Sequence, residues 1–313
     1  MELCLETVTK SFGEKKVLDG ISFTASGGAA LGLLGRNGAG KTTTIRIIMG
    51  VFPPDGGIVR VEGQPIDKAD VSFGYLPEER GLYPKQKIIE QMIYIGRLRG
   101  LSRHAAKKSA EYWLDRLDMA DHRNDLLRTL SKGNQQKIQL GVCLIHNPDI
   151  VILDEPFSGL DPVNAQLLKD IVSELAAAGK TVIFSSHQMS YVEEFCDSIA
   201  ILDKGKIALE GNLRSIKRSY DRNKIMVSLE GGGTAARLES LRAEGRLGGF
   251  VTDIQAADRP AEADDHAVVH IAAPADKDRL LQEILAAGCS LESFQIMEPT
   301  LEQIFVERVG EAK

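Results

Sequence analysis

The stretch Gly35–Thr42, "GRNGAGKT", constrains the fold more than any other part of the sequence. It matches the pattern G-x-x-x-x-G-K-[ST] in full and lies between an apolar run, "AALGLLG", and a helical run, "KTTTIRIIMGV". A loop of this kind binds phosphate when it joins a buried strand to a helix N-terminus, because the glycines let backbone N–H groups approach the anion. The sequence therefore predicts a nucleotide-binding α/β domain built on a parallel sheet. A chance match of a glycine-rich turn is the weaker alternative.

Two side chains of this loop have a predicted chemistry of their own. The Lys41 ammonium neutralises the β- and γ-phosphates, and the Thr42 hydroxyl is a ligand for Mg²⁺. The other members of the loop contribute mainly backbone N–H groups. They are Gly35, Arg36, Asn37, Gly38, Ala39 and Gly40.

Polar residues follow two further apolar runs. Asp154 ends "DIVILD" and is placed to hold the Mg²⁺ shell, while Glu155 comes next and can polarise the attacking water. His187 follows "TVIFSS". Because the carboxyl ends of parallel strands meet at one crevice, we expect this imidazole near the γ-phosphate. Solvated acids and a structural histidine are the plainer alternatives, but a protein that only binds nucleotide has no need of Glu155.

The stretch "LSKGN", Leu130–Asn134, has the composition of a second anion site. Ser, Gly and Asn precede a helical run, as they do at a helix N-terminus. Helical sequence, not a strand, lies ahead of it, so it cannot belong to the same phosphate loop. It could bind a nucleotide held by a different subunit; an ordinary capped helix is the alternative.

Composition excludes several classes of function. The formal net charge is −6, and neither part of the chain has the basic excess of a general nucleic-acid binder. No apolar run approaches the roughly 20 residues that span a bilayer, and "MELCLETVTK" does not resemble a signal peptide. The four cysteines are scattered, which favours free thiols in the cytoplasm over a disulfide framework or metal site.

The pattern of elements predicts two domains. Residues 1–218 read as an α/β domain with a helical subdomain at about 82–146. Residues 222–313 read as β-α-β-β-α-β with a closing amphipathic helix, "TLEQIFVERVG", which is typical of a small α+β, ferredoxin-like domain. The "GGG" at 231–233 lacks a following Lys-Ser/Thr, so we expect a turn there.

The order and spacing of these motifs resemble the ATP-binding subunit of an ABC transporter over residues 1 to about 218. The phosphate loop is followed by an "LSGGQ"-like signature, then "LDEP", "SGLD" and a histidine. The resemblance implies an ATPase that uses ATP and Mg²⁺, in which two nucleotide-binding subunits pack head to tail around two ATP molecules. Each ATP then lies between one subunit's phosphate loop and the other's signature.

The resemblance also implies a role for individual residues. The loop from Gly35 to Thr43 would bind phosphates, Asp154 the magnesium, Glu155 would be the general base and His187 would contact the γ-phosphate. On the surface that faces the second subunit, Ser131 and Gly133 would contact the partner's ATP. Ser158–Asp161 would form a loop that spans the dimer. Phe12 matches the aromatic residue that stacks on adenine; a core phenylalanine at a strand end is the alternative.

The sequence departs from the family pattern at three positions. Lys132 and Asn134 replace the middle glycine and the glutamine of the signature. Glu78, in "LPEERGLYP", stands where the family usually has a glutamine that touches Mg²⁺ or water and reports to the membrane subunit. A carboxylate can still bind Mg²⁺, so we expect Glu78 to keep the coupling role. A solvated acid is the alternative.

"PEERGLYP" and the ending "EPTLEQIFVERV" resemble the ATPases of bacterial exporters of the sodium-efflux and drug-resistance kind. The expected partners are an integral membrane permease and a second nucleotide-binding subunit, identical or not. The segment from Glu78 to about Arg99 is expected to contact the permease. The expected location is the inner face of the membrane. The alternative is a soluble ABC-type ATPase acting on a macromolecule; one set of motifs, no heptads and no basic excess count against it.

Overall fold

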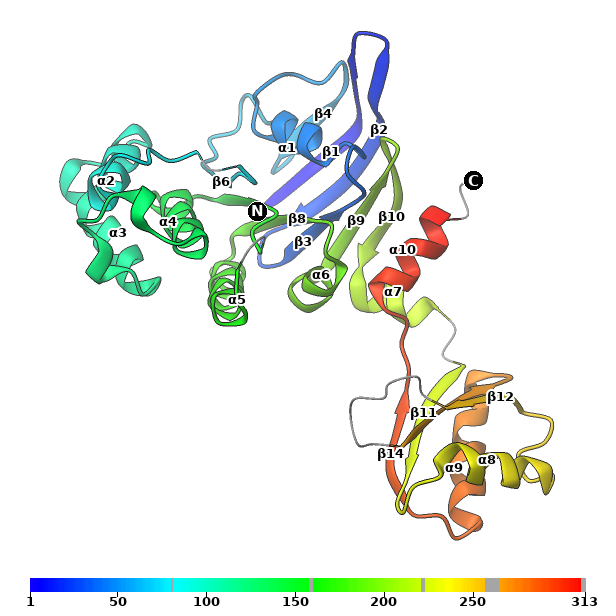
Figure 1. Cartoon of the computed structure of the whole chain (residues 1–313). Helices are drawn as coiled ribbons and strands as arrows, with labels where there is room; N and C mark the ends of the chain where they lie inside the picture. The colour runs from blue at the N-terminus through cyan, green and yellow to red at the C-terminus, as the bar shows by residue number, and fades with distance from the viewer. Residues whose placement is uncertain (80, 158–159, 221–222, 257–264, 311–313) are drawn as a thin grey trace. The chain divides into compact units, whose positions relative to one another are not determined.

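The computed structural model describes residues 1–79, 81–157, 160–220, 223–256 and 265–310. The chain forms two compact units (Figure 1). The first consists of Met1–Leu213 together with Ile304–Lys313, and the second of Arg214–Gln303. Each is described by itself.

A six-stranded sheet forms the centre of the first unit, in the order β10-β9-β3-β8-β7-β6. The neighbours from β9 to β6 pair in parallel, and β10 is antiparallel to β9. Every residue of β3, β7 and β8 is buried, which confirms the parallel sheet predicted from the apolar runs. The strands are β3 (Ala30–Leu34), β6 (Phe73–Leu76), β7 (Ile150–Asp154), β8 (Thr181–Ser186), β9 (Ser198–Asp203) and β10 (Lys206–Asn212).

A second, antiparallel sheet packs over α1 (Lys41–Ile48), in the order β2-β1-β4-β5. Its strands are β1 (Glu2–Phe12), β2 (Lys15–Ser26), β4 (Gly56–Val61) and β5 (Gln64–Pro65). Leu5 and Phe23 from this sheet, Ile45 from α1, and Ile152 and Ile183 from the parallel sheet belong to one hydrophobic core. This core fixes α1, and with it the phosphate loop, against both sheets.

Helices complete the first unit. Figure 1 shows α5 (Pro162–Ala177) and α6 (Met189–Phe195) on one side of the parallel sheet, and a separate group of helices beyond β6. That group contains α2 (Ile88–Leu98), α3 (Arg103–Arg116), two 3₁₀ turns (Ala120–His122 and Leu127–Thr129) and α4 (Lys132–Leu144). It fills the stretch for which the sequence predicts helices.

The second unit contains a four-stranded antiparallel sheet in the order β12-β13-β11-β14. Its elements are α7 (Leu213–Ser219), β11 (Lys224–Leu229), α8 (Thr234–Ala243), β12 (Val251–Ala256), β13 (His266–Ile271), the 3₁₀ turn Pro274–Asp276, α9 (Lys277–Ala286) and β14 (Leu291–Ile296). Leu238 of α8 and Leu280 of α9 share a core with Val227 and Val269 of the sheet. The β-α-β-β-α-β order and this strand order are those of a ferredoxin-like sandwich, as predicted. Gly231–Gly233 all have positive φ and form a turn.

The closing helix, α10 (Leu301–Gly310), differs in its grouping from the sequence-based expectation. The sequence assigned it to the second domain, but from Ile304 onward it groups with the first unit. Its predicted apolar face is buried, and the Arg36 guanidinium lies 6.0 Å from the Phe305 ring. An amphipathic pattern predicts that a helix buries one face, but it does not specify which core receives that face.

Among the helices within the described ranges, none is both long and apolar enough to cross a membrane.

Candidate nucleotide site

The phosphate loop joins the end of β3 to the start of α1. Gly40, the N-cap of α1, has a φ of +116°, and a Cβ there would lie 2.6 Å from Leu18 Cδ2. A Cβ at Gly35 would lie 2.4 Å from the Leu202 carbonyl oxygen. These positions therefore require glycine for both conformation and space. Gly40 provides no side-chain cap, so the first N–H groups of α1 are presented to a ligand.

Lys41 is buried at the floor of this loop, with 8% of its surface exposed. Its Nζ donates to the Gly35 carbonyl oxygen at 2.7 Å. Burial lowers the pKa of Lys41, and the negative charges of Glu155, Asp154 and Glu78 partly oppose this shift. Because the three carboxylates outnumber the one ammonium, an anionic ligand would bind here most favourably together with a cation of its own.

Asp154 is the last residue of β7 and only 3% of its surface is exposed. Burial raises the pKa of its carboxyl, and the charges of Glu78 and Glu155 act in the same direction. Tyr75 of β6 lies beside it, with its hydroxyl 3.4 Å from Asp154 Oδ2. Burial and this carboxylate raise the pKa of Tyr75 to about 12. The tyrosine therefore stays a neutral donor facing Asp154.

Glu155 has a left-handed backbone, with a φ of +50°, which is unusual for a residue other than glycine. This conformation costs on the order of 1–3 kcal/mol and is often found at functional sites. The Glu155 N–H donates to the Ser185 carbonyl oxygen at 2.9 Å, which fixes the turn after β7 onto β8. The turn points the Glu155 side chain toward the end of β8.

There the Glu155 carboxylate meets three groups, one from the last residue of β8 and two from the residue after it. Oε1 accepts from the His187 backbone N–H at 2.9 Å and lies 2.7 Å from the His187 ring Nδ1. Oε2 accepts from the Ser186 hydroxyl at 3.1 Å. The His187 side chain is 54% exposed, whereas that of Glu155 is 8% exposed. Because Nδ1 faces Glu155, the imidazole presents Nε2 to a ligand. The sequence predicted both residues but not this pairing or the contribution of Ser186.

A cleft of about 320 Å³ unites most of the predicted residues. Lys15 and Val17 of β2 also line it, and the sequence analysis missed them; their only signal is their position just after the turn that follows Phe12. The lining consists of Phe12, Lys15, Val17, Arg36, Asn37, Gly38, Gly40, Lys41, Thr42, Thr43, Glu78, Asp154, Glu155 and His187. Gly35 and Ala39 are buried within the loop and do not line the cleft.

Phe12 lies at the tip of the β1–β2 hairpin, where it pairs with Lys15 across the turn. Half of its surface is exposed, so it is not a core residue. Its ring packs edge to face against Phe52, with centroids 5.5 Å apart, and Lys10 Nζ lies over both rings. A supported, exposed aromatic face at the mouth of the cleft is suited to stacking on a flat ring.

Ser131, Gly133 and Asp161 form a separate group that does not line the cleft. Ser131 caps α4, and its Oγ accepts from the Asn134 N–H at 3.2 Å. Asp161 caps α5 by accepting from the Asn164 N–H at 2.9 Å, and this bond contributes to a lowered pKa of the aspartate. A Cβ at Gly133 would lie 3.6 Å from Asn164 Nδ2, so the two caps are neighbours. Ser158 and Gly159 lie outside the described residues.

Comparisons with known proteins agree with this geometry. Residues 18–158 match the family model for ABC transporters, and residues 211–309 match the model of the C-terminal domain of DrrA1-3-like ATP-binding proteins. The chain is 39% identical to the ABC transporter ATP-binding protein YhaQ of Bacillus subtilis, covering 98% of both chains. It is 33% identical to the linearmycin resistance ATP-binding protein LnrL of the same organism, covering 97% of both. A solved ATP-binding subunit of an ABC transporter superposes with a TM-score of 0.65 at 28% identity, covering 70% of this chain and 93% of that one.

The chain therefore belongs to the ABC transporter ATP-binding proteins, the family of ATPases that drive transport. The predicted family, fold class and enzyme class are confirmed. Its C-terminal part is of the DrrA1-3-like kind, in agreement with the resemblance to drug-exporter ATPases seen in the ending of the sequence.

Proposed function

We propose that the chain hydrolyses ATP between two nucleotide-binding subunits and powers a separate membrane permease that exports its substrate. Phe12 stacks on adenine, and the loop from Gly35 to Thr43 surrounds the phosphates. The Lys41 ammonium lies among carboxylates at the base of that loop, where the β- and γ-phosphates would replace the Gly35 carbonyl as its partner.

The residues at the end of the cleft fit a magnesium ion. Asp154 and Glu78 offer carboxylates and Thr42 a hydroxyl, which are the hard oxygen donors that Mg²⁺ prefers. In a nucleotide site Mg²⁺ is typically bound by one or two carboxylates and completed by phosphates and water. When bound, the ion neutralises charge that develops on the phosphoryl oxygens.

Glu155 is the general base in this proposal. Its carboxylate is buried, lies beside Lys41 in the cleft, and accepts hydrogen bonds from the end of β8. Such anchoring holds the carboxylate where it can take a proton from a water in line with the γ-phosphorus. His187 is anchored by the same carboxylate and directs its other nitrogen toward the γ-phosphate.

The observation that carries the proposal is the separation of the chain's two anion sites. The phosphate-loop cleft and the capped N-terminus of α4 belong to one unit, yet Ser131 and Gly133 do not line the cleft. A second copy or a related subunit, packed head to tail, would bring its α4 cap to the γ-phosphate. Asp161, beside that cap, would then lie at the subunit interface.

The permease would dock on the helical group. Tyr83 and Tyr94 are each about half exposed and line a cavity of about 440 Å³ with Gln86, Glu90 and Gln91. This cavity lies within Glu78 to Arg99, the range expected to meet the permease's cytoplasmic helices.

Export is favoured by the match to the DrrA1-3-like model and by the relative named for linearmycin resistance. In this proposal the chain lies at the inner face of the membrane, and the C-terminal domain regulates or stabilises the dimer.

Purification of the tagged full chain from detergent-solubilised native membranes tests the partner. We expect a stoichiometric multi-spanning protein that stimulates phosphate release when the two are reconstituted. Recovery of ribosomes or of soluble proteins alone would instead support the second candidate, an ABC-type ATPase that acts on a macromolecule.

A further inference from the structure

One buried glutamine of α4 holds the backbone on both sides of Glu78. Only 4% of the Gln139 surface is exposed. Its Nε2 donates to the Pro77 carbonyl oxygen at 3.3 Å and to the Glu79 carbonyl oxygen at 3.1 Å. Glu78 lies between these two carbonyls and lines the nucleotide cleft. A single side chain thus joins α4 to the segment that presents Glu78.

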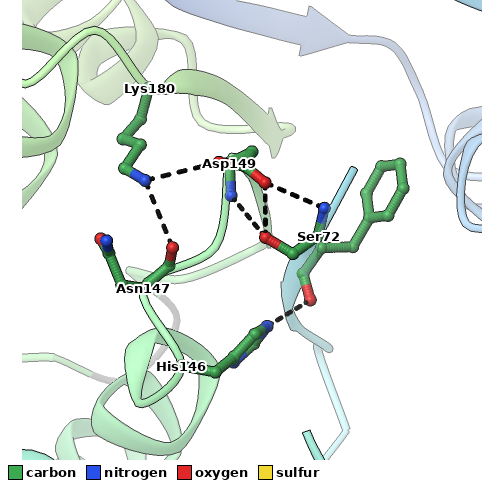
Figure 2. A network of polar contacts seen from close by, with 6 residues as sticks. Ser72, His146, Asn147, Asp149 and Lys180 are labelled. Atoms are coloured by element: carbon green, nitrogen blue, oxygen red, sulfur yellow. Dashed lines mark hydrogen bonds and ion pairs between the residues drawn. The ribbon is translucent and has the colours of Figure 1, made fainter. Parts of the chain in front are cut away.

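The segment that follows α4 holds the other end of β6 (Figure 2). Asp149 Oδ2 accepts from the Ser72 backbone N–H at 3.0 Å and from the Ser72 hydroxyl at 2.6 Å. His146 donates from Nε2 to the Phe73 carbonyl oxygen at 3.0 Å, and Lys180 forms an ion pair with Asp149 at 3.7 Å. Strand β6 is therefore bound at its beginning by the residues after α4 and just past its end by Gln139.

These contacts connect α4 to the Glu78 segment, so that a displacement of one would displace the other. Gln139 lies about two turns from the N-terminus of α4, and an α-helix is rigid over that length. The Gln139 amide is buried and these two carbonyls are its partners, so losing them would be costly and a shift of the Glu78 segment would carry the glutamine with it. Ser131 at the start of α4 then moves as well.

We propose that Gln139 is a positioning residue that couples Glu78, in the cleft of one subunit, to the α4 cap that Ser131 presents to the second subunit's ATP. The inference rests on the proposed function, because it takes Glu78 as a nucleotide contact and Ser131 as a contact to the opposite ATP. The plainer reading is a glutamine that only satisfies two turn carbonyls.

A double-mutant cycle with Gln139→Met and Glu78→Ala in the full chain distinguishes coupling through Glu78 from a purely structural glutamine. Met keeps the length of the side chain and removes its donor. We expect Gln139→Met to lower kcat about fivefold to tenfold, within the range seen for coupled residues of one network, with the KM for ATP unchanged. In the Glu78→Ala background the same substitution should have no further effect. Equal fold-losses in both backgrounds would show that Gln139 does not act through Glu78.

Two further variants test whether the effect is specific to the Gln139 hydrogen bonds. Gln139→Leu, which keeps most of the side-chain volume and has no donor, should give the same loss of kcat and the same non-additivity; wild-type kcat would contradict the inference. Ser109→Ala removes a 2.6 Å hydrogen bond to the Ile145 carbonyl oxygen at the C-cap of α4, a bond that involves no residue of β6 or of the Glu78 segment, and should leave kcat unchanged. A wild-type chain that does not turn over ATP would contradict the proposed function instead.

Discussion

Replacing Glu155 by Gln is expected to lower steady-state phosphate release by about 100-fold to 10,000-fold, the contribution typical of a positioned general base. The amide keeps the size of the side chain and can still bond Ser186 and His187 at the end of β8, so ATP binding should be retained. It cannot accept the proton of the attacking water. Phosphate release under saturating ATP, together with equilibrium ATP binding, measures both quantities.

Glu244→Gln is the matched control for this substitution. Glu244 is an exposed carboxylate that does not line the cleft, so the same loss of charge there should leave turnover unchanged. An E155Q chain that keeps more than about a tenth of wild-type turnover would remove Glu155 from the role of base, since even weak general-base catalysis exceeds that factor.

Replacing Lys41 by Ala should weaken ATP binding by at least about 30-fold. Truncating one member of a buried charged pair typically costs 2–5 kcal/mol. The loss should be large here because Glu155, Asp154 and Glu78 would face the triphosphate without a fixed cation. Titration with a fluorescent ATP analogue measures the dissociation constant directly.

Lys16→Ala controls for the loss of a lysine near the site. Lys16 pairs with Asp19 on β2 and does not line the cleft, so its removal should leave the dissociation constant unchanged. Equal affinities for wild-type and K41A chains would mean that nucleotide binds elsewhere.

The parts of the fold predicted most reliably are those that short-range sequence patterns specify. A fully apolar run followed by a glycine-rich turn specifies β3 and the phosphate loop, because few other backbones satisfy both. The β-α-β-β-α-β order of the second unit likewise follows from alternating patterns in short segments. Once the strands are parallel, Asp154 and His187 must lie at the same edge of the sheet.

What could not be predicted depends on side chains that meet only after folding. The contact between Glu155 and His187 requires the left-handed turn at Glu155, which no pattern in "LDEP" reveals. Gln139 reads as one polar residue in a helix, and its two carbonyl partners lie about sixty residues away. The grouping of α10 with the first unit also depends on contacts that form only after folding, and its amphipathic pattern does not reveal it.

The mass of the E155Q chain in solution, with and without Mg-ATP, shows whether ATP brings two copies of the chain together. One chain has a mass of 34.1 kDa. We expect Mg-ATP to convert this species to one of twice that mass. Adding Ser131→Arg, which places a bulky side chain at the α4 cap, should prevent the conversion while ATP still binds the phosphate loop. A single-chain mass with one ATP bound per chain would contradict the claim that two copies of this chain enclose the ATP.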